Sequence, residues 1–137
     1  MTRMPVDFSG TWVADLSTSI FRGPQPASLR LNISHSEPEL REELVFARPD
    51  GIEDHSRFVC QTTGDDGTCL LNNIPIPGCA CWVKQELVIE TRIRLAEREV
   101  YLCDCWSLSS DEETLVMEHR NDALAGQRVV FKRFSPA

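Results

Sequence analysis

Asp104 and His119 are the two residues of this sequence that are best suited to bind a ligand group or to transfer a proton. If the chain turns at residues 111–112, the segments on either side pair so that the two residues stand opposite each other. Side chains opposite each other on one face of a sheet lie about 4.5–5.5 Å apart at Cβ, close enough for a hydrogen bond. Such a pair could bind an anionic ligand head, act as a general acid or base, or serve as a structural hydrogen bond. A different register would place both residues in solvent. The other two histidines, His35 and His55, are expected at turns or on outer surfaces.

The segment before Asp104 is expected to form a neighbouring strand. Residues 87–95 alternate apolar and polar side chains, which is typical of a half-buried strand. If residues 97–98 form a two-residue turn, Thr91 falls opposite Asp104 on the next strand. We therefore expect Thr91, Asp104 and His119 in a row across three strands, on an inner face that is otherwise apolar.

Two pairs of cysteines, at 79–81 and 103–105, could supply four thiolates to a zinc ion. With a turn at residues 84–85, these pairs lie on strands separated by a third, about 9–10 Å apart at the backbone. Thiolates that share one zinc, at about 2.3 Å per bond, must approach much more closely. We therefore expect no metal and reduced thiols. Cys60 and Cys69 are expected about one register step from direct opposition. A labile disulfide between them is therefore an alternative under oxidising conditions.

Length and charge limit the classes of protein to consider. A chain of 137 residues has the size of one domain, spanning residues 1–137. Its formal charge of −7 argues against nucleic acid or an anionic membrane as the main partner. It has no apolar run of about 20 residues and no apolar signal segment, so we expect a cytoplasmic protein. No nucleophile motif or glycine-rich phosphate loop is present, and we expect no cofactor.

Short alternating segments recur along the chain and predict an all-β protein. About nine or ten strands at a spacing of 8–12 residues are typical of a sandwich or barrel, and consecutive hairpins favour an antiparallel up-and-down β-barrel. Residues 74–78 contain two prolines and are expected to form a loop. The other expected strands are residues 28–34, 40–46, 52–63, 68–71, 79–83 and 128–134.

The two ends of the chain resemble those of the calycin group, the lipocalins and fatty-acid-binding proteins. Residues 8–12 (Phe-Ser-Gly-Thr-Trp) are similar to the N-terminal Gly-x-Trp motif of that group, with Gly10 and Trp12 in the motif positions. Residues 128–133 resemble its closing strand. The resemblance implies a lipocalin-like barrel with an apolar ligand inside, in which Arg133 packs across Trp12.

The sequence departs from the fatty-acid-binding proteins in two places. Residues 16–27 are too few for their two-helix lid. Their carboxylate-binding Arg-x-Tyr pattern is incomplete, because Arg128 is followed by Val130 where the tyrosine would stand. These departures argue against fatty-acid carriage by that mechanism.

We expect the barrel to bind a small, mostly apolar molecule, with Asp104 and His119 orienting a polar group. An enzyme on the same scaffold is the first alternative: an isomerase or cyclase with His119 as proton carrier and Asp104 as its orienter. A filled barrel that serves as a protein-interaction module is the second, and a homo-oligomer is left open. The residues expected to line the cavity are Ile89, Thr91, Asp104, Trp106, Met117, His119 and Val129.

Overall fold

The computed structural model describes residues 6–65, 67–120 and 125–134, and this part of the chain is all β. It contains no helix, and thus none long and apolar enough to cross a membrane. The strands are β1 (Gly10–Ala14), β2 (Ser28–Ser36), β3 (Glu39–Ala47), β4 (Glu53–Gln61), β5 (Gly67–Leu71), β6 (Ile74–Val83), β7 (Glu86–Leu95), β8 (Arg98–Leu108), β9 (Thr114–His119) and β10 (Arg128–Arg133).

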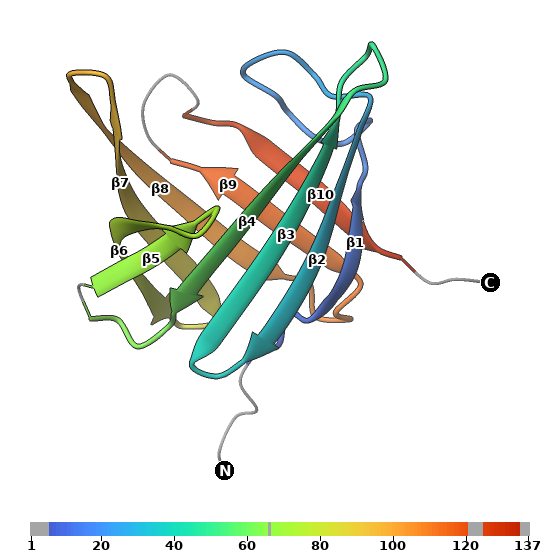
Figure 1. Ribbon diagram of the computed structural model, residues 1–137. Coiled ribbons are helices and arrows are strands. Elements are labelled where there is room, and N and C mark those ends of the chain that lie inside the picture. Colours follow the sequence, from blue (N-terminus) through green and yellow to red (C-terminus); the bar gives the residue numbers. More distant parts are fainter. Residues whose placement is uncertain (1–5, 66, 121–124, 135–137) are drawn as a thin grey trace.

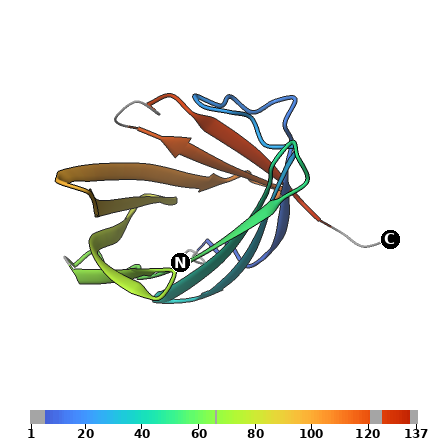
Figure 2. The same ribbon diagram turned by 45° about the horizontal axis from the view of Figure 1, so that its top comes forward.

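The strands form a closed antiparallel barrel in which each pairs with its neighbours along the chain (Figure 1). Pairing of β1 with both β2 and β10 closes the ring, and the strands wrap around a common axis (Figure 2). Each strand is therefore paired on both sides over at least part of its length, so no strand lies at a free edge of the sheet. The predicted all-β, antiparallel up-and-down barrel is confirmed, with ten strands.

Gly10, Trp12 and Arg133 pack together where β1 meets β10. Trp12 is fully buried, and its indole N–H donates to the carbonyl of Phe8 at 3.0 Å. The guanidinium carbon of Arg133 lies 4.2 Å from the centre of the Trp12 ring, a cation–π contact. Gly10 has a φ of 138°, a backbone conformation that favours glycine, and a Cβ at this position would also lie 2.5 Å from Nη1 of Arg133.

His35 is buried, and its expected place at the surface is wrong. Its Nδ1 accepts the backbone N–H of Phe8 at 3.1 Å, so its Nε2–H donates to Glu37 at 2.6 Å. The same carboxylate accepts the hydroxyl of Thr62 and the indole N–H of Trp82. Because these polar groups satisfy one another, the histidine is tolerated in the interior.

Residues 74–78 form the first half of β6, and the loop expected there is wrong. Pro75 and Pro77 lie in the ladder with β5, whereas pairing of β6 with β7 begins only at Gly78. On the side facing β7, the two prolines therefore have no strand partner to which a backbone N–H would donate. Proline is accepted in a strand under this condition, because its missing N–H then costs no hydrogen bond.

The register of β7 and β8 differs by two residues from the expected one. The turn lies at residues 96–97, so Thr91 is opposite Leu102, and Asp104 is opposite Ile89. Ala96 adopts a left-handed conformation in this turn, with φ of 55°. A shift of two residues leaves every side chain on the same face, so the alternation of the sequence cannot detect it. The expected row of Thr91, Asp104 and His119 is therefore wrong, although all three face inward.

Candidate functional site

Asp104 on β8 and His119 on β9 form a hydrogen-bonded pair that faces the interior. They are opposite each other in the register, and Nδ1 of His119 lies 2.7 Å from Oδ1 of Asp104. Burial raises the pKa of Asp104, and the hydrogen bond to His119 opposes that rise.

The other ring nitrogen of His119 is the unusual feature of this pair. The His119 side chain is 8% exposed, and its Nε2 is buried without a hydrogen-bond partner in the described part of the chain. Because Asp104 accepts the Nδ1 proton, the neutral ring presents Nε2 as an acceptor. A buried polar atom without a partner costs free energy, so a ligand that donates a hydrogen bond there would relieve that cost.

Glu42 on β3 belongs to the same site, although it is not among the residues expected there from the sequence. It is half-buried and lines the interior beside Asp104. Burial, followed by the charge of Asp104, raises the pKa of the Glu42 carboxyl to about 7. The signal in the sequence is the alternation of β3: Leu40 and Leu44 flank Glu42 at a spacing of two and place it on their inward face.

Two cavities of about 200 and 210 Å³ lie inside the barrel. They share three wall residues, Glu42, Asp104 and Trp106, and are otherwise lined mainly by apolar side chains. All seven residues expected to line a cavity are present in these walls. Met117, His119 and Val129 line the first cavity, Ile89 and Thr91 line the second, and Asp104 and Trp106 line both.

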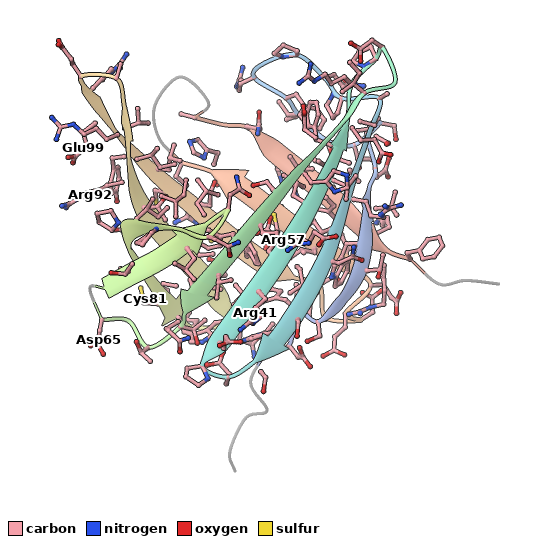
Figure 3. The ribbon with its side chains drawn as sticks, viewed as in Figure 1. Arg41, Arg57, Asp65, Cys81, Arg92 and Glu99 are labelled. Atoms are coloured by element: carbon pink, nitrogen blue, oxygen red, sulfur yellow. The ribbon has the colours of Figure 1, made fainter. Side chains whose placement is uncertain are left out.

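Among the described residues, neither cavity is lined by an arginine or a lysine. The basic residues of the neighbouring strands stand elsewhere: Arg41 and Arg57 lie on the outer face of β3 and β4 (Figure 3). Arg128 is exposed and pairs in the ladder with Glu118. The titratable side chains that line the two cavities are the carboxyl groups of Glu42 and Asp104 and the imidazole of His119.

The four cysteines of β6 and β8 are separated by β7, as expected from the sequence. Cys79 and Cys103 flank one residue of β7, and Cys81 and Cys105 flank another. Within the described ranges, no group of three or more His, Cys, Asp or Glu side chains is arranged to hold a metal ion.

Cys60 and Cys69 are buried thiols on β4 and β5. The ladder of β4 and β5 pairs Phe58 with Leu71 and Val59 with Leu70 and ends before it reaches the two cysteines, so their expected offset stays a prediction. Burial, followed by the neighbouring Cys69, raises the pKa of Cys60 to about 12. Cys60 is therefore held as the neutral thiol at physiological pH.

No family model matches the sequence, and no curated protein was found to resemble it. The class of protein is therefore defined by the fold itself, a closed ten-stranded antiparallel β-barrel. This architecture is compatible with the calycin arrangement, and its interior holds cavities.

Proposed function

We propose that this protein is a lipocalin-like, single-domain barrel that binds a small, mostly apolar molecule in its interior. The two adjoining cavities, of about 200 and 210 Å³, carry the proposal. Ligand sites are typically concave and apolar, with a few polar groups that fix orientation. Asp104, His119 and Glu42 would be those groups. We retain the cytoplasmic location as part of this proposal.

The cavities favour ligand binding over an interaction module with a filled barrel. A packed interior has few voids larger than a water molecule, and each of these cavities is much larger. Binding of a fatty acid through an inward-facing arginine is not part of the proposal, because Arg128 lies at the surface.

A neutral apolar dye, N-phenyl-1-naphthylamine, tests the proposal by fluorescence titration. We expect saturable binding that Leu102→Trp weakens by about tenfold or more, or roughly 1.4 kcal/mol, because the larger side chain fills the second cavity. Arg92→Trp is the matched control, since Arg92 points away from the barrel on the paired strand (Figure 3). Equal affinity in both variants, or no saturable binding to the wild type, would contradict the proposal.

The unpartnered Nε2 of His119 favours a second candidate function, proton transfer to and from a bound ligand. In this role His119 is the general base and Asp104 is the positioning residue that fixes its ring. Phenylacetone in D₂O is a suitable probe, because a base that removes a proton next to the carbonyl returns a deuteron. If the barrel is an enzyme, exchange followed by NMR should exceed the buffer rate, and His119→Gln should slow it by about 10²–10⁴-fold. Exchange at the buffer rate would exclude this activity for such ketones.

A further inference from the structure

The polar groups that line the two cavities are mainly hydrogen-bond acceptors, which favours a ligand whose polar group is a donor. Glu42 and Asp104 line both cavities, and His119 lines the first. A carboxylate only accepts hydrogen bonds, and Nε2 of neutral His119 also accepts. The described walls include no arginine or lysine to balance them. The interior therefore offers hydrogen-bond acceptors and negative charge to whatever enters.

We propose that the cavity selects apolar ligands that carry a cationic amine, held by the carboxylates of Glu42 and Asp104 and by Nε2 of His119. This inference rests on the proposed function and adds the chemical class of the ligand. An ammonium group has three N–H donors and no acceptor, which complements a set of three acceptors. Hydrogen bonds between ionised groups are roughly twice as strong as neutral ones.

The buried Nε2 of His119 is the observation that distinguishes a ligand site from a cluster of acids. Asp104 and His119 already satisfy each other through Nδ1, so a purely structural pair would need nothing further. The second ring nitrogen nevertheless lies buried without a partner in the described structure, on a side chain that lines the first cavity. A donor carried by the ligand would complete its hydrogen bonding.

The aromatic wall fits the same ligand class. Trp106 lines both cavities together with Glu42 and Asp104. A tryptophan face attracts an organic cation as well as apolar groups. An anionic head, by contrast, would lie beside two carboxyl groups without a cation to offset the repulsion.

The ionisation of Glu42 gives the selection a pH dependence. With a pKa of about 7, the Glu42 carboxyl is mostly neutral at pH 6 and mostly ionised at pH 8. The titratable groups around it are Asp104 on β8, His119 on β9 and Cys60 on β4, whose thiol stays neutral. An alkylamine remains protonated at both pH values. Its affinity should therefore rise with pH, and that of a carboxylate should fall.

Displacement of N-phenyl-1-naphthylamine by three probes with one phenyl ring tests the inference. The probes are 2-phenylethylamine, 2-phenylethanol and phenylacetate, which differ mainly in the head group. At pH 8 we expect the amine to bind about tenfold more tightly than the alcohol, as a charge-assisted hydrogen bond predicts, and phenylacetate to bind most weakly. The preference for the amine should shrink several-fold at pH 6.

Glu42→Gln and Asp104→Asn should each reduce the preference for the amine over 2-phenylethanol several-fold, because each removes a negative charge from the walls of both cavities. Glu43→Gln is the matched control, because Glu43 is the next residue of β3, lies opposite Arg57 in the ladder, and by strand alternation faces away from the interior. Dye binding without a preference for the amine, or a preference that survives both substitutions, would overturn the inference and leave the proposed function standing. No binding of the dye or of any probe would overturn both.

Discussion

Replacing Trp12 by alanine should lower the free energy of unfolding by about 3–5 kcal/mol, the range found for large aromatic side chains removed from protein cores. Trp12 is fully buried where the two ends of the barrel meet. Its removal leaves a cavity, frees the carbonyl of Phe8, and takes away the ring on which Arg133 rests. Urea denaturation followed by circular dichroism measures the change.

Val13→Ala is the control for this prediction, because Val13 is the next residue of β1 and is 36% exposed. Its loss should cost less than about 1 kcal/mol, since little apolar surface is removed from the interior. Similar losses in the two variants would show that closure of the barrel does not depend on the packing of Trp12.

Replacing Glu42 by glutamine should stabilise the protein at pH 8 and leave its stability unchanged at pH 4. The pKa of Glu42 is raised from 4.5 to about 7, so the folded state keeps a proton that the unfolded state has lost between these values. The contribution of Glu42 to stability is therefore fully present below pH 4.5 and is lost as the pH rises through 7. Between pH 4 and pH 8, the free energy of unfolding of the wild type should drop by about 1–3 kcal/mol relative to that of Glu42→Gln.

The difference between wild type and variant isolates Glu42 from the other groups that titrate, and urea midpoints from pH 4 to pH 8 would measure it. Glu43→Gln is again the matched control. The Glu43 carboxylate lies 3.4 Å from the guanidinium of Arg57 at the surface, and such pairs contribute at most about 1 kcal/mol. A stability difference between wild type and Glu42→Gln that does not grow with pH would contradict the placement of Glu42 in the interior.

The barrel could be predicted because period-two alternation and turn residues repeat along most of the chain. The pairing of Asp104 with His119 followed from the turn at 111–112, and the structure contains it. Two features of the fold could not be predicted from the sequence because they depend on tertiary context. The prolines at 75 and 77 suggested a loop, yet they lie where β6 has a neighbour on one side only. The turn between β7 and β8 lies one residue earlier than expected, which shifts their register by two residues, and hydrophobic alternation cannot detect a shift of two.

Glu42 shows the limit of reading one residue at a time. A glutamate in a strand usually suggests a solvent-facing position, and charged residues are rarely buried. The apolar residues two positions away on either side, Leu40 and Leu44, place it inside instead. Its closeness to Asp104 could not be predicted, because β3 and β8 lie on separate parts of the barrel and are not paired.

The central claim, that the interior receives a small apolar ligand, is tested most directly by NMR with 2-phenylethanol. The three tryptophans give three indole N–H resonances, which substitutions can assign. The resonance of Trp106 should shift with saturation, because Trp106 lines both cavities. That of Trp12, which is bonded to Phe8 at the closure of the barrel, should stay in place. A Trp106 resonance that does not move at saturating probe would contradict the claim.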